Sequence, residues 1–272
     1  MKTLRRAAIA FLMLVGTAAL APELWAPADY AAQDRESPDA PPSRSHLLGT
    51  DLLGRDRFSR LVYGTRISLL LAPSAALISC VAAGLLGSIA ALSGPAIEWA
   101  ILSAADLFLS LPWLFLLLSV RAFLPLNVSA IASVSITFLL LAVLGWAAPA
   151  RVVCTGVRRL RDSDFMLYAS AAGATRGQWL WTHILPNIKT LLFTQFWVAV
   201  PAYVLAEATL GMLGLGINEP LPSWGSLLHE VEGGSIGSQP WLLAPVVLLA
   251  MVVGSFQFLA KHSQSGPLED YS

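Results

Sequence analysis

Two carboxylates inside apolar stretches of the sequence are the first candidates for chemistry. Asp106 and Glu207 each lie in a long hydrophobic stretch, where an ionised side chain is costly unless it is paired or hydrated. Each is therefore either a residue that lines a pathway or a structural charge. A membrane-embedded enzyme could also use them, or a histidine, as a general acid or base. The four histidines fall in predicted loops or at helix ends, and no two have metal-ligand spacing: His46, His183, His229 and His262.

The motifs of the common catalytic classes are absent from the sequence. It contains no CxxC, HExxH or GxSxG, and no GxxxxGK[ST] loop that could cradle the phosphates of a nucleotide. Cys80 and Cys154 stand in or beside apolar segments, so we predict that they are packing residues. We therefore predict a non-catalytic chain that binds no metal or cofactor itself.

The composition determines which elements must position these residues. Of the 272 residues, 56% are hydrophobic and only 12% are charged, whereas a soluble domain carries roughly 25% charged residues. The sequence thus predicts an all-α membrane protein with six transmembrane helices. The expected spans are a helix within 1–26, then about 68–92, 98–120, 122–150, 188–216 and 241–260. The first span also fits a signal peptide, because a basic start precedes a short apolar core.

Polar stretches divide the chain into an external loop at 27–66, a five-helix core at 67–260 and a cytoplasmic tail at 261–272. In the external loop, the Gly-Thr-Asp-x-x-Gly-Arg-Asp spacing predicts a turn that leads into a capped amphipathic helix at the membrane surface. The motif residues are Gly49, Asp51, Gly54, Arg55 and Asp56. The plainer interpretation is an interfacial anchor with no other role.

The most basic window of the chain is the loop at 151–187. Residues 151–189 hold six Lys or Arg against two acids, whereas residues 217–240 hold three Glu and no Lys or Arg. By the positive-inside rule the basic loop faces the cytoplasm, and so do both termini. Small residues around Gly173 would let another surface approach closely, which predicts a docking element for a partner protein. The alternative is a loop that only fixes orientation.

This loop resembles the "EAA" loop of the permeases of binding-protein-dependent ABC importers, whose pattern is Glu-Ala-Ala, three residues, Gly, nine residues and Ile-x-Leu-Pro. Gly173 is followed at that distance by Leu185 and Pro186, and Ala169 holds the second alanine position. Sequences typical of the dipeptide, oligopeptide and nickel branch of this family surround it: HPLGTDxLGRDxxSRLxYGxRxSL resembles 46–69, GWxxYARVVR resembles 145–153, RHILPN resembles 182–187, AEAxLSFLGLG resembles 206–216, and PxPSWGxML resembles 221–228. The resemblance covers about 46 to 260.

The sequence departs from the family pattern at two places. Leu167 stands where the family has its glutamate, and Tyr168 replaces the first alanine. Ser103 stands where the family has an arginine three residues before Asp106. The first change alters the docking geometry that the family pattern implies, and the second leaves Asp106 without its usual neighbour.

The resemblance implies one permease subunit of an ATP-driven importer in the bacterial cytoplasmic membrane. Its implied partners are a second homologous permease, two ATP-binding subunits that hold ATP and magnesium, an extracytoplasmic solute-binding protein, and membrane lipid, with no nucleic acid. The implied coupling-loop contacts with the ATP-binding subunits are Ala169, Ala172, Gly173, Ala174, Arg176, Leu185 and Pro186. Peptides, nickel chelates and related small solutes remain open as substrates.

Three other functions remain open at this point. One is the membrane-embedded enzyme introduced above. A second is an ion-conducting channel subunit, although no repeated filter or ring-forming charge is visible in the sequence. A third is a degenerate permease that assembles but does not transport, which the missing glutamate and arginine would fit.

Overall fold

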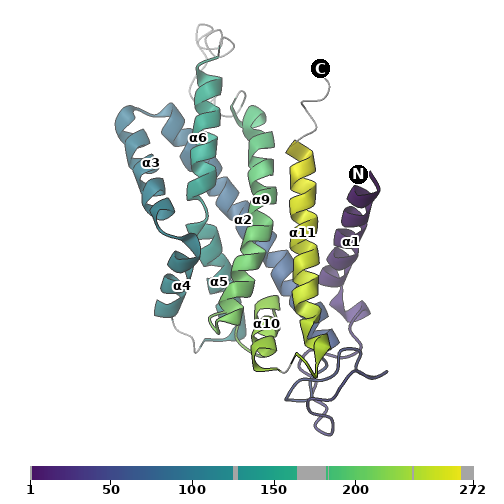
Figure 1. Ribbon diagram of the computed structural model, residues 1–272. Coiled ribbons are helices and arrows are strands. Elements are labelled where there is room, and N and C mark those ends of the chain that lie inside the picture. Colours follow the sequence, from purple (N-terminus) through teal and green to yellow (C-terminus); the bar gives the residue numbers. More distant parts are fainter. Residues whose placement is uncertain (1, 125–127, 164–181, 183, 235, 265–272) are drawn as a thin grey trace. The chain divides into compact units, whose positions relative to one another are not determined.

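The computed structural model describes residues 2–124, 128–163, 182, 184–234 and 236–264. Within these residues every named regular element is a helix, which confirms the all-α membrane fold class (Figure 1). The long helices are α1 (Lys2–Leu20), α2 (Arg57–Leu92), α3 (Pro95–Ser110), α4 (Trp113–Phe123), α5 (Ala130–Leu144), α6 (Ala147–Arg161), α9 (Leu185–Met212), α10 (Trp224–Gly233) and α11 (Ala244–Gln264). Two short 3-10 helices, η1 (Pro22–Leu24) and η3 (Pro240–Leu243), complete them.

Five helical stretches among the described residues are long and apolar enough to cross a membrane: Thr3–Leu20, Arg57–Leu92, Ala130–Arg161, Leu185–Met212 and Pro240–Lys261. A sixth results if α3 and α4, which are bent by 86° relative to each other, count as one broken span. The bend falls at Leu111, whose extended backbone is typical of a residue before proline. The count agrees with the six spans expected, although the third was predicted to be a single helix.

The chain forms two compact units. The first consists of Met1–Pro73, Val120–Phe138 and Val200–Ser272, and the second of Ser74–Ser119 and Leu139–Ala199. Within the first unit α11 packs against both α1 and α10. Within the second unit α3 packs along α6 (Figure 1).

The core of the second unit explains one difference from the expected fold. Its buried cluster consists of Ala90, Ala91, Val153, Cys154, Val157, Ile184 and Ile188. The residues from α6 recur at helical spacing, so their burial makes residues 147–161 a helix instead of part of a loop. The loop predicted at 151–187 is therefore shorter: α6 ends at Arg161 and α9 begins at Leu185. Cys154 is a packing residue of this core, and Cys80 is also a buried thiol.

α2 differs from the sequence prediction in a similar way. We expected a surface helix ending near residue 66 and a separate span, but α2 is one helix of 36 residues. No break occurs because Leu61, Val62 and Thr65 are buried along the same face, and the helix accommodates Pro73 internally. The division expected between 66 and 67 thus falls inside a helix.

The acidic segment at 217–240 contains the helix α10. Ser223 caps its N-terminus, and Ser223 and Ser226 each accept a hydrogen bond from the other's backbone N–H. The indole of Trp224, in the first turn, is fully buried. α10 is thus an anchored element of the first unit.

Candidate functional site

The Gly-Thr-Asp-x-x-Gly-Arg-Asp motif at residues 49–56 forms the turn that its spacing predicts. The Asp51 carboxylate accepts hydrogen bonds from the backbone N–H of Leu53 at 2.9 Å and of Arg55 at 2.8 Å. Gly54 has φ +77, and a Cβ there would lie 1.9 Å from the carbonyl oxygen of Asp34. Only glycine fits such a backbone without a shift. The motif is therefore held in one conformation.

Asp56 closes the motif and begins α2. Its carboxylate accepts the backbone N–H of Ser59 at 2.7 Å, which is the helix cap expected at this position. The other carboxylate oxygen lies 3.0 Å from Nδ1 of His46. His46 thus supports the cap, and no group of Asp, Glu, His or Cys among the described residues could hold a metal ion.

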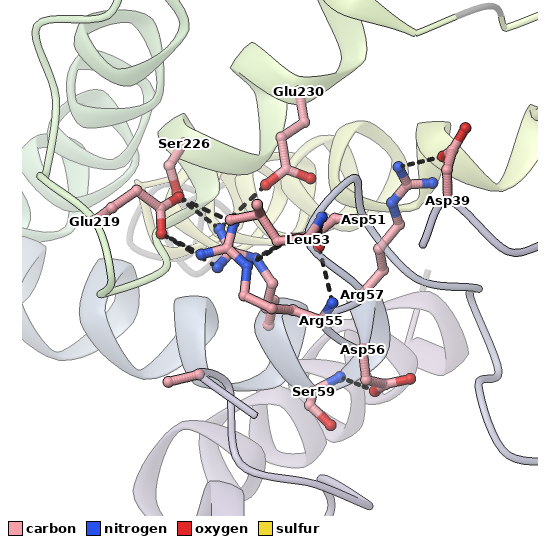
Figure 2. Close-up of polar contacts among 12 residues, drawn as sticks. Asp39, Asp51, Leu53, Arg55, Asp56, Arg57, Ser59, Glu219, Ser226 and Glu230 are labelled. Carbon is pink, nitrogen blue, oxygen red and sulfur yellow. Dashed lines mark hydrogen bonds and ion pairs between the residues drawn. The ribbon is translucent and has the colours of Figure 1, made fainter. Parts of the chain in front are cut away.

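Asp51 and Arg55 of the motif belong to a group of five alternating charges, here called the ion cluster, which Figure 2 shows in part. Its other members are Arg60, Glu219 and Glu230. Arg55 lies 2.6 Å from Asp51 and 2.5 Å from Glu219. Arg60, which is fully buried, lies 2.9 Å from Glu219 and 3.1 Å from Glu230. Because truncating one partner would leave a buried charge unpaired, the cluster ties the motif and α2 to the 217–240 segment.

Within the ion cluster the pKa values of the two glutamates shift in opposite directions. Burial alone would raise the pKa of Glu219, but hydrogen bonds and charge from Arg60 and Arg55 outweigh it and lower that pKa below its ordinary 4.5. Burial raises the pKa of Glu230 above 4.5, since the attraction of Arg60 offsets only part of the cost. Burial lowers the pKa of Arg55, but the hydrogen bonds to Glu219 and Asp51 raise it by more. The net shift of that pKa is therefore upward. Glu219 is thus the firmly ionised member.

Glu207, predicted to be a pathway or structural charge, is completely buried in α9. Its carboxylate accepts a hydrogen bond from the Ser68 hydroxyl at 2.8 Å. The same hydroxyl accepts the backbone N–H of Trp224 at 3.2 Å, and the indole N–H of Trp224 donates to Thr65 at 3.0 Å. These contacts join α2, α9 and α10 inside the first unit, which favours the structural role for Glu207.

Asp106 is paired in the second unit. Its carboxylate contacts the guanidinium of Arg151, and both side chains are about half exposed. A second ion pair, between Glu98 and Arg158, joins the same two helices, α3 and α6. Arg151 thus takes the place of the nearby arginine that the sequence lacks at 103.

The predicted docking residues Ala169, Ala172, Gly173, Ala174 and Arg176 lie outside the described residues. Leu185 and Pro186, the last two of that set, form the first turn of α9 and are exposed. Proline is well tolerated there because the first N–H groups of a helix have no intrahelical partner. The loop is therefore bracketed by two defined helix ends.

Sequence reasoning missed Arg60, Glu219 and Glu230 as members of the ion cluster, and it missed Ser68 as the partner of Glu207. A signal was available: the 217–240 segment carries three glutamates and no Lys or Arg, so a stable fold must supply cations from elsewhere. Arg55, in the turn motif, and Arg60, just after it, are the cations that pair with these glutamates. Ser68 gave no such signal, because a serine in an apolar helix is common.

Comparison with known proteins gives one family and several relatives. The family described as "Binding-protein-dependent transport system inner membrane component" matches residues 83–264. The chain is 33% identical to the dipeptide transport system permease protein DppC of Alkalihalophilus pseudofirmus, over 80% of this chain and 70% of that protein. It is 30% identical to the oligopeptide transport system permease protein OppC of Bacillus subtilis, over 82% and 70%. The dipeptide transport system permease protein DppC of Bacillus subtilis is 29% identical, over 91% and 76%.

Proposed function

This chain belongs to the family of binding-protein-dependent transport system inner membrane components, and from that premise we propose that it forms one half of the membrane pathway of an ATP-driven peptide importer. Members of this family are permease components of ABC transporters and not their catalytic subunits. The chain is therefore a transmembrane permease subunit, which rules out the interpretation as a membrane-embedded enzyme.

We propose a peptide substrate because the chain is similar to peptide permeases along most of its length. The relatives in Alkalihalophilus and Bacillus are named for dipeptide or oligopeptide transport, and each alignment covers at least 80% of this chain. Nickel chelates, the other substrate class considered from the sequence, have no such support among these relatives.

The partner composition belongs to the same proposal. A second homologous permease completes the pathway, and two ATP-binding subunits hold ATP and magnesium. One ATP-binding subunit docks on the loop between Arg161 and Leu185. Closure of the ATP-binding subunits moves this loop, and the permease helices change between two access states.

The proposed orientation places both termini and the 162–184 loop in the cytoplasm. Six spans bring the chain back to its starting side, and the basic α6 end supports a cytoplasmic location for that end. The 49–56 motif, the ion cluster and α10 are then extracytoplasmic. A solute-binding protein delivers the peptide to this side.

The test is ATP-dependent uptake of a labelled dipeptide by vesicles that contain the reconstituted complex. Gly173→Trp in the docking loop is expected to abolish both uptake and copurification of the ATP-binding subunits. Gly237→Trp is the matched control, because no atom lies within 4 Å of a Cβ at Gly237. Normal uptake by Gly173→Trp would overturn the docking role, and a wild-type complex that assembles without uptake would favour the degenerate permease.

A further inference from the structure

A pocket of about 540 Å³ opens beside the ion cluster, within the first unit. Its polar lining comes from the loop before α2, from the first residue of α2, from Glu219, from α10 and from Gln239. The polar side chains are Asp39, Asp51, Arg55, Arg57, Glu219, Glu230 and Gln239. This volume can hold one large side chain of another protein, and it is named here the external pocket.

The charged side chains of the external pocket differ in their exposure to solvent. Three of the four carboxylate side chains are accessible: Glu219 is 54% exposed, Asp39 is 39% and Glu230 is 26%, whereas Asp51 is 5% exposed. The arginines behind them are covered, with Arg55 at 9% and Arg57 at 11%. A group that enters the pocket thus meets negative charge first, which favours a cation.

The arrangement of these carboxylates also limits the chemical class of the ligand. No set of Asp, Glu, His or Cys in the described part of the chain has an arrangement that could hold a metal ion. Asp39 accepts a hydrogen bond from Gln239 at 3.0 Å and lies 3.3 Å from Arg57, the contact drawn in Figure 2, so its two oxygens are already oriented. An organic cation with several N–H donors fits such spread acceptors better than a metal ion does.

Two exposed leucines form an apolar rim beside this charge. Leu52 is 78% exposed and Leu53 is 53% exposed, and both line the pocket. They belong to the 49–56 motif, outside every candidate membrane span in the described chain. The two leucines supply apolar contact area to a protein partner, and the charges beside them determine which partner fits.

The apolar rim is also held in one conformation, which reduces the conformational entropy lost on binding. The backbone N–H of Leu53 is held by the Asp51 carboxylate at 2.9 Å, and Gly54 fixes the turn that follows. Arg55 in turn connects this turn to Glu219. Because the surface is ordered before the partner arrives, little conformational entropy is lost on docking.

We propose that the external pocket receives a lysine or arginine side chain of the solute-binding protein, while Leu52 and Leu53 pack against apolar surface around that side chain. The inference rests on the proposed function, since it requires an extracytoplasmic binding protein. It adds the residues and the chemistry of the contact: an acidic, leucine-rimmed pocket on the permease and a basic residue on the partner.

The experiment measures the affinity of the purified solute-binding protein for the complete importer in lipid nanodiscs. Leu52→Ala and Asp39→Asn are the test variants. Leu52 is mostly exposed, so its truncation removes no core contact. Asparagine tolerates the positive φ of Asp39 and keeps a side-chain oxygen, and it removes the charge that pairs with Arg57. Each is expected to weaken binding about tenfold, as for a contact at an interface centre. Glu219→Gln is avoided because Glu219 also holds Arg55 and Arg60.

Glu232→Gln is the matched control, because Glu232 is an exposed glutamate of α10 that does not line the pocket. It is expected to bind as the wild type does. Added salt should weaken the wild type more than Asp39→Asn, since the pocket contact is electrostatic. The inference is overturned if both test variants bind like the wild type or if the control loses as much.

A second measurement separates a protein partner from a lipid surface. A fluorophore on Leu52→Cys should be shielded by the solute-binding protein and unaffected by quenchers attached to lipid chains. Quenching by the lipid probes would overturn the inference, because the rim would then lie in the membrane. If the wild-type importer binds no solute-binding protein at all, the proposed function fails as well, and the two failures are thereby distinguished.

Discussion

The hydroxyl of Ser68 donates a hydrogen bond to the carboxylate of Glu207 across 2.8 Å, between two helices that both lie in candidate membrane spans. Ser68 also accepts the backbone N–H of Trp224, so one small side chain connects α2, α9 and the start of α10. Fully buried carboxylates are costly, and this one is retained where three helices must keep their register.

Replacing Ser68 by alanine is expected to destabilise the permease by about 1–3 kcal/mol, because the Glu207 carboxylate and the Trp224 N–H both lose a buried partner. The measurement is the thermal unfolding midpoint of the purified chain in detergent. Ser135→Ala is the control, since that exposed hydroxyl bonds only to the carbonyl of Ile131 in its own helix. Equal midpoints for the two variants would contradict the prediction.

Gly225→Ala is expected to cost about 1–3 kcal/mol through overpacking. A Cβ at Gly225 would lie 2.7 Å from the carbonyl oxygen of Glu207 and 2.8 Å from the Cα of Gly211, and backbone atoms cannot move aside as a flexible side chain can. Gly237→Ala, with no atom within 4 Å of its Cβ, should be neutral. Unfolding curves of the two variants, recorded side by side, give the difference.

Reversing one charge of the Asp106–Arg151 pair should destabilise the second unit, and reversing both should restore part of the loss. Asp106→Arg alone places two guanidinium groups together on α3 and α6. Adding Arg151→Asp rebuilds the pair in the opposite sense, with an expected coupling of about 0.5–3 kcal/mol. A double-mutant cycle on the unfolding midpoint measures it, and strictly additive effects would show that the pair is not coupled.

The stability of the first unit should pass through a maximum as the pH falls. The folded pKa of Glu230 is raised, so protonation relieves a cost as the pH drops toward the ordinary 4.5 and stability rises. The folded pKa of Glu219 is lowered, so its contribution is lost only as the pH drops below 4.5. Unfolding midpoints at a series of pH values show both effects.

Glu230→Gln provides the check on this assignment. In this variant the stability should no longer rise as the pH falls toward 4.5. It should still decrease below pH 4.5, since Glu219 is unchanged. If the rise persists in the variant, another group is responsible for it.

Much of this protein could be predicted from its sequence because apolar length and turn chemistry are local. The six spans, the turn at Gly49 and Gly54, and the Asp56 cap all follow from residues close together in the chain. Errors arose where burial decided the structure. Residues 151–161 read as a basic loop, but the buried face of Val153, Cys154 and Val157 makes them helical.

The candidate site was predicted only in part, for the same reason. Spacing identified the 49–56 motif but not the glutamates that it meets, because Arg55 and Glu219 are 164 residues apart in the chain. Contacts at such separation depend on how helices pack, which local patterns do not determine. The same holds for Arg151, whose pairing with Asp106 joins two helices that the sequence places far apart.

The length of α2 connects the external pocket to the membrane. Thirty-six helical residues extend about 54 Å, whereas the hydrocarbon core of a bilayer is about 30 Å thick. Unless it tilts steeply, a helix of that length extends beyond the hydrocarbon layer, and the first residue of α2, Arg57, lines the external pocket. The external pocket is thus built in part on a helix that also crosses the membrane.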